Sequence, residues 1–157
     1  KKSKPLGSED ISAVEFVKEM LQNNPTYGIN FDRIQWNSEE KRYIIVEFLL
    51  CEERQCEHGI TPNTSHPNRY FHYSMGGRGN AQKFISLWKI AQDLKGVLYL
   101  VNYAKKGTKY DDEVFLMKVL DVNKNDIKNP VDTENKKFTR AEFSKWFREL
   151  NEKGSQI

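Results

Sequence analysis

Two carboxylates, Asp32 and Glu47, are the residues whose types and spacing most directly suggest chemistry. Each lies in a predicted strand, and the polar residues 38–41 between the strands predict a hairpin. If these residues form the loop, Asn37 pairs with Arg42 and Asp32 lies opposite Glu47, with the two Cβ atoms about 4.5–5.5 Å apart. A two-residue loop instead makes them diagonal neighbours within about 8 Å. Both loops place the two carboxylates on one side of the sheet.

A close pair of carboxylates repels unless a proton or a cation lies between them. Oxygen ligands of this kind suit Mg²⁺ or Mn²⁺. Such a metal activates water and stabilises charge on a phosphodiester. The spacing therefore predicts a Mg²⁺ or Mn²⁺ site held by Asp32 and Glu47. The alternative is that Glu47 is a buried acid satisfied by an Arg or Tyr side chain, and that Asp32 is an ordinary strand-edge acid.

The elements that must position this pair follow from the spacing of apolar residues. Strands 42–50 and 97–103 are apolar on both faces, which is typical of central, covered strands. A helix between them implies a right-handed crossover and parallel pairing. The sequence thus predicts an α/β or α+β fold, in which helices flank a mixed central β-sheet. Apolar residues predict helices over 8–23, 80–95 and from 139 onward, strands over 31–36, 42–50, 97–103 and 114–122, and a polar linker over 123–137.

This order of helix, strand hairpin, helix and strand resembles the core of the PD-(D/E)XK nuclease superfamily, the restriction-endonuclease-like fold. The motif of that family is an Asp at the start of one strand and Glu-x-Lys in the next. Asp32 matches the Asp, and Glu47-Phe48-Leu49 occupies the Glu-x-Lys positions. The resemblance covers residues 8–103. It implies a Mg²⁺-dependent nuclease of a restriction, phage or mobile-element system.

The main departure from the motif is Leu49, which stands where the family has a lysine. That lysine orients the attacking water and stabilises developing charge. Some members supply the charge from the following helix, where this chain has Lys83 with Gln82 beside it. The resemblance then implies that Asp32, Glu47 and Lys83 are catalytic. Without such a cation, the domain would be an inactive module that binds nucleic acid or a protein, as an inhibitor, immunity or accessory subunit does.

Basic residues flank a glycine-rich turn that precedes the second helix. Arg69, Arg78 and Gln82 are the predicted contacts to nucleic acid, and DNA is favoured over RNA. The formal net charge of +3 and a pI near 8.8 permit a nucleic-acid partner without requiring one. The alternative for each of these side chains is that it only solvates the surface.

Both cysteines and all three histidines lie between residues 51 and 72. Cys51, Cys56, His58 and His66 offer four ligands suited to tetrahedral Zn²⁺, although their spacing matches no common zinc finger. A zinc-stabilised interaction domain is therefore a further hypothesis. The alternative is that Cys51 is a small apolar residue at a strand end and that the histidines are exposed loop residues.

The composition is that of one folded domain. Among 157 residues, 38% are hydrophobic and 30% are charged, and no apolar run approaches the ~20 residues of a membrane span. Two cysteines indicate a reducing compartment, and we expect a cytoplasmic protein with no membrane partner. The predicted organisation is a flexible tail over 1–7 and one domain over 8–157. Within that domain, 8–104 would form the nuclease-like core, and 105–157 would add a strand, a linker and a helix.

Overall fold

The computed structural model describes residues 12–25, 28–29, 32–72, 74–75 and 78–155, with only the backbone given at 74–75, 78–79 and 155. The chain divides into two compact units between residues 30 and 31. The first unit contains helix α1 (Ser12–Leu21). Helical spacing predicts one buried apolar face here, but no residue of α1 is buried, and Val14, Val17 and Met20 are each more than half exposed.

The second unit is built on a six-stranded sheet in the order β7-β6-β5-β2-β1-β8. β2 and β5 are parallel, and the other neighbouring strands are antiparallel. The predicted mixed sheet of an α+β protein is therefore confirmed. The six strands are β1 (Arg33–Asn37), β2 (Arg42–Leu50), β5 (Val97–Tyr103), β6 (Val114–Val122), β7 (Val131–Phe138) and β8 (Gly154–Ser155).

The predicted linker over 123–137 is wrong in its second half, because β7 pairs there with β6 along the sheet edge. Among the residues of β7 only Val131 and Phe138 are buried, so its sequence lacks the apolar alternation that marks a strand. A separate two-stranded sheet joins β3 (Ser74–Met75) and β4 (Arg78–Gly79).

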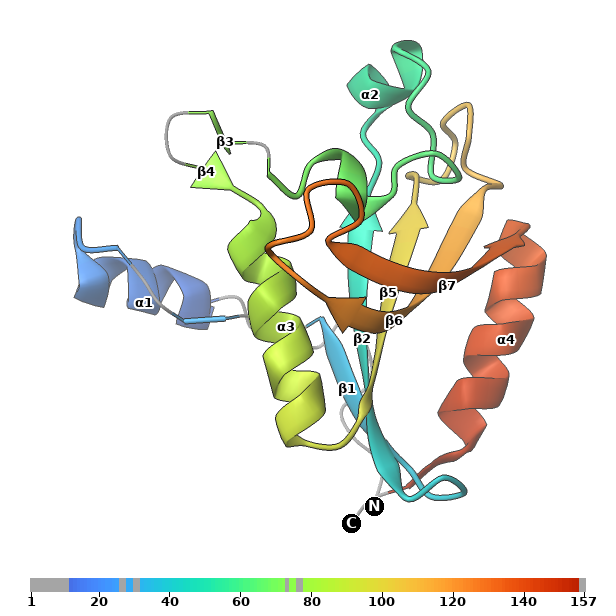
Figure 1. The fold of residues 1–157 in the computed structure, drawn as a ribbon. Coiled ribbons are helices and arrows are strands. Elements are labelled where there is room, and N and C mark those ends of the chain that lie inside the picture. The colour runs from blue at the N-terminus through green and yellow to red at the C-terminus, as the bar shows by residue number, and fades with distance from the viewer. Residues whose placement is uncertain (1–11, 26–27, 30–31, 73, 76–77, 156–157) are drawn as a thin grey trace. The chain divides into compact units, whose positions relative to one another are not determined.

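Two long helices cover opposite faces of the main sheet (Figure 1). α3 (Ala81–Asp93) packs Phe84 and Leu87 against one face, and α4 (Arg140–Glu152) packs Leu150 against the other. A capping box begins α4, because Thr139 and Glu142 each accept a hydrogen bond from the other's backbone amide. The loop after β2 contains the short helices α2 (Glu53–Glu57) and η1 (Pro67–Arg69).

The crossover from α3 to β5 passes very close to β2. A Cβ atom on Gly96 would lie 2.6 Å from the carbonyl oxygen of Tyr43, so only glycine fits there. The left-handed residue that ends the helix is the preceding Lys95, with φ of 54°. The Gly96 amide then donates to the carbonyl of Ala91 over 2.8 Å. This contact sets the position of β5 against β2.

Two adjacent substitutions test this close approach by shifting stability in opposite directions. Gly96→Ala should lower the free energy of unfolding by about 1–3 kcal/mol, because the paired backbone of β2 resists displacement. Lys95→Gly should raise it by up to about 1 kcal/mol, because glycine adopts positive φ without strain. Urea denaturation followed by circular dichroism measures both values. Equal effects of the two variants would contradict the account.

Candidate active site

The hairpin register aligns Asp32 with Glu47. Asn37 pairs with Arg42 and Arg33 pairs with Val46, so of the two loops that the sequence allowed, the four-residue loop over 38–41 is the one present. Asp32 directly precedes β1, and the same register continues toward Glu47. The loop is fixed locally, because the side-chain oxygen of Asn37 accepts hydrogen bonds from the backbone amides of Glu39 and Glu40, over 3.0 and 3.1 Å.

Glu47 is a buried carboxylate, only 6% exposed, in the middle of a central strand. Lys83, in the first turn of α3, places its Nζ 3.0 Å from Oε1 of Glu47. The other oxygen, Oε2, is buried and has no hydrogen-bond partner among the described residues. A buried acceptor without a partner costs free energy. The carboxylate is therefore satisfied on one oxygen only.

Asp32 is held against the same stretch of β2. Its Oδ2 accepts a hydrogen bond from the Phe48 backbone amide over 2.8 Å. The pKa of Glu47 is raised, first by burial and further by the negative charge of Asp32. The hydrogen bond and charge of Lys83, and the backbone amide of Asp32, lower that pKa without cancelling the rise. A proton on Glu47, or a second cation beside it, would relieve the remaining free-energy cost of burying its carboxylate.

This donor set fits a hard divalent cation. The unpartnered Oε2 of Glu47 and the neighbouring Asp32 carboxylate are oxygen donors, and Mg²⁺ usually takes one or two carboxylates and fills its other positions with water or phosphate. Within the described part of the chain, no cluster of three or more His, Cys, Asp or Glu side chains is arranged for a metal. The protein would thus supply two carboxylates.

Leu49, which stands where the PD-(D/E)XK motif has a lysine, is in an apolar environment. Leu49 is partly buried and packs against the hydrophobic cluster beneath α3. The ammonium group reaches Glu47 from α3 instead, and Asp32 lies close enough to raise the pKa of Glu47. Whether Lys83 takes the part of the missing motif lysine stays a prediction.

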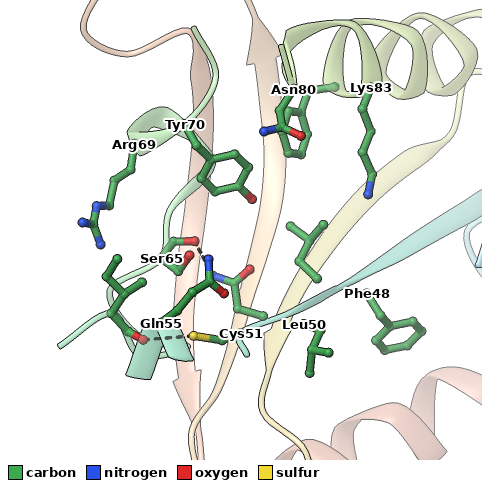
Figure 2. A pocket seen from close by; sticks show the side chains of 13 residues that line it. Phe48, Leu50, Cys51, Gln55, Ser65, Arg69, Tyr70, Asn80 and Lys83 are labelled. Carbon is green, nitrogen blue, oxygen red and sulfur yellow. Dashed lines mark hydrogen bonds between the residues drawn. The ribbon is translucent and has the colours of Figure 1, made fainter. Parts of the chain in front are cut away.

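A pocket of about 650 Å³ adjoins this cluster (Figure 2). It opens at the carboxyl ends of the parallel strands β2 and β5, beside the amino end of α3. Crevices at the carboxyl ends of parallel strands are the usual ligand sites of such sheets. Lys83 lines the pocket and also pairs with Glu47, so the pocket and the carboxylate pair share one side chain.

Sequence reasoning missed four polar residues of the pocket: Gln55, Ser65, Asn80 and Asn102. Asn102 is the one that a pattern could have revealed, because it is a polar residue in an otherwise apolar central strand. It is 2% exposed, and its Nδ2 donates to the carbonyls of Pro62 and Ser65 over 3.1 and 2.6 Å. Asn102 therefore anchors the loop that forms one wall of the pocket.

The three residues predicted to contact nucleic acid, Arg69, Arg78 and Gln82, do not line one common site. Arg69 lines the pocket, but its guanidinium points away from the other labelled side chains, and its Nη1 donates to the Thr64 carbonyl over 3.3 Å (Figure 2). Gln82 does not line the pocket, and its Nε2 donates to Ser86 Oγ over 2.7 Å along α3. The backbone of Arg78 lies in β4, and its side chain lies outside the described residues.

The two cysteines lie close together, with their sulfur atoms 3.6 Å apart. Cys51 is buried, and its thiol donates to the Ile60 carbonyl over 3.0 Å. Burial, with the neighbouring Cys56, raises the pKa of Cys51 to about 12, so the thiol stays protonated at neutral pH. This environment suits a small packed residue better than a nucleophile.

His66 has a structural role on the same loop. Its Nδ1 accepts from the Asn68 amide over 3.1 Å at the start of η1, and its Nε2 lies 2.8 Å from Thr133 Oγ1. Burial lowers the pKa of His66. Both ring nitrogens thus have protein partners, whereas His58 follows α2 on the exposed surface. Zinc binding by Cys51, Cys56, His58 and His66 stays a prediction.

Comparison with known proteins gives no family model, no curated protein and no solved structure that matches the chain significantly. None of the described helices is long and apolar enough to cross a membrane. The case for function therefore rests on the geometry of the site.

The raised pKa of Glu47 predicts how stability changes with pH. The folded protein holds the proton of Glu47 more tightly than the unfolded chain, so this stabilisation is complete below the ordinary pKa of 4.5 and is lost as pH rises through the folded pKa. The free energy of unfolding of Glu47→Gln should therefore rise relative to wild type above pH 4.5, by about 1.4 kcal/mol for each unit of pKa shift.

Urea denaturation of both proteins in metal-free buffer, repeated between pH 4 and pH 8, measures this difference. Glu134→Gln, which removes an exposed carboxylate on β7, is the matched control. A stability difference between Glu47→Gln and wild type that stays constant over this range would contradict the electrostatic account.

Proposed function

We propose that this domain is a metal-dependent nuclease of the PD-(D/E)XK type, which hydrolyses phosphodiester bonds in DNA or RNA. The observation that carries the proposal is the ion pair of Lys83 with the buried Glu47, beside Asp32, with one buried oxygen of Glu47 lacking a hydrogen-bond partner among the described residues. This oxygen and the adjacent Asp32 would hold Mg²⁺ or Mn²⁺. When bound, that ion would activate water and stabilise charge on the phosphodiester.

The side chains of the site have separate roles in this proposal. Asp32 is oriented by the Phe48 amide, which restricts the rotation of its carboxylate. Lys83 takes the part of the motif lysine: its ammonium would position the attacking water and stabilise negative charge on the phosphate. The amino end of α3 adds a favourable potential for an anion beside Lys83. The proposed substrate is therefore a polyanion.

A second candidate function is an inactive binding module on the same scaffold. Leu49 favours it, because the chain lacks the motif lysine on β2. In that case, the Lys83–Glu47 ion pair would only neutralise a buried charge. The module would bind nucleic acid or a protein partner without cleaving either. Cleavage assays separate these two candidates.

The first test is cleavage of labelled single- and double-stranded DNA and RNA with Mg²⁺, with Mn²⁺ and with a chelator. We expect cleavage that requires the metal. It should fall by more than about 100-fold in Asp32→Asn and Glu47→Gln, which remove a charged ligand, and by about 100- to 1,000-fold in Lys83→Met, which removes the stabilising cation. Circular dichroism checks that each variant is folded.

The matched control is Lys89→Met, on the same helix. Lys89 forms an exposed i,i+4 pair with Asp93 over 3.0 Å and lies outside the pocket lining. Its loss should change the rate by less than about twofold, because exposed pairs of this kind contribute little. No cleavage of any substrate by folded wild type, together with retained binding of nucleic acid or a protein, would favour the inactive module.

A further inference from the structure

The pocket beside Glu47 bears on what kind of strand the site accepts. Its volume of about 650 Å³ lies within the range of pockets that hold small ligands, roughly 300–1,000 Å³. Three parts of the chain enclose it: the ends of β2 and β5, the first turn of α3, and the loop that carries α2 and η1. Lys83 both lines this pocket and pairs with Glu47, so it connects the pocket to the carboxylate site.

Away from Lys83, the pocket is lined mainly by uncharged polar groups and apolar surface. Uncharged amides of Gln55 and Asn80, the phenol of Tyr70, and apolar surface from Leu49 make up much of the remainder. In Figure 2, the Tyr70 hydroxyl points toward the middle of the pocket. Burial raises the pKa of Tyr70 to about 12, so this hydroxyl stays a hydrogen-bond donor at neutral pH.

Asn80 is placed where a helix-capping residue belongs, but it does not cap. It is the N-cap residue of α3, and its side chain makes no hydrogen bond to the first turn. Asparagine at this position usually accepts such a bond from the backbone. Here the amide lines the pocket instead, and can offer a donor and an acceptor to a ligand. Paired donor and acceptor groups are what the edge of a nucleobase presents.

We propose that the pocket binds one unstacked base of a single-stranded nucleic acid, next to the phosphate that Asp32, Glu47 and Lys83 engage. The inference rests on the proposed function, because the strand enters the pocket from the carboxylate site. Lys83 would contact the phosphate, while the amides and Tyr70 would contact the base. A base in an intact duplex is paired and stacked, so it cannot enter without being extruded. Single strands are therefore the preferred substrate class.

The test measures binding without cleavage, in a chelator, by fluorescence anisotropy. The probes are a nine-residue oligothymidylate, a strand of nine abasic deoxyribose phosphates with the same charge, and a nine-base-pair duplex. We expect the oligothymidylate to bind about tenfold or more tightly than the abasic strand, because contacts to a base add to contacts with phosphates. The duplex should bind more weakly than the oligothymidylate at equal salt concentration.

Two variants of one residue locate the effect. Asn80→Leu removes the donor and the acceptor of the amide at nearly the same size and should remove the preference for bases. Asn80→Asp has the same size and adds a negative charge, which the amino end of α3 tolerates, so the protein should stay folded while its affinity for the oligothymidylate falls by about tenfold. Asn125→Leu, in the exposed turn before β7, is the matched control and should bind as wild type does.

Equal affinity for the oligothymidylate and the abasic strand would overturn the proposal, and so would an unchanged preference for bases in folded Asn80→Asp. Preference for the duplex over the single strand would overturn it as well. These results leave the cleavage test unaffected. Conversely, loss of the proposed nuclease activity with a retained preference for bases would leave the pocket as a binding site of the inactive module.

Discussion

The candidate site depends on one buried carboxylate, that of Glu47. Glu47 lies on a strand that is covered on both faces, where an ionised carboxylate is costly unless other groups compensate it. Lys83 compensates one oxygen of the carboxylate, and Asp32 is held close enough to raise the pKa of Glu47 further. A fold that only needed stability would place an apolar side chain here. The retained charge is therefore the strongest sign that this end of the sheet has a function.

The topology explains why the charged groups and the pocket share one edge of the sheet. β2 and β5 run parallel, so their carboxyl ends lie side by side, and α3 must begin at that same edge to connect them. The loop after β2 then covers this edge. Buried polar contacts fix the loop: Asn102 donates to two of its carbonyls, and Thr61 Oγ1 donates to Glu113 over 2.9 Å. The loop is thus a preformed wall.

Much of this arrangement could be predicted from the sequence, and the failures have physical causes. Hairpin register follows from loop length, so the sequence predicted that Asp32 and Glu47 share one side of the sheet, and the structure decided between direct and diagonal neighbours. β7 was not, because an edge strand needs few apolar residues. The reach of Lys83 depends on how α3 packs, and the partners of His66 lie far apart in the sequence. Clustered histidines alone therefore do not reveal whether their nitrogens are already bonded.

The most direct test of the central claim is anomalous diffraction from crystals soaked in Mn²⁺. The account predicts one strong anomalous peak in contact with Oε2 of Glu47 and the carboxylate of Asp32, and no peak there in crystals of Glu47→Gln grown and soaked in the same way. An ordered wild-type site without any peak at saturating Mn²⁺, with Lys83 still paired to Glu47, would contradict it. The carboxylate pair would then be a structural feature of a binding module.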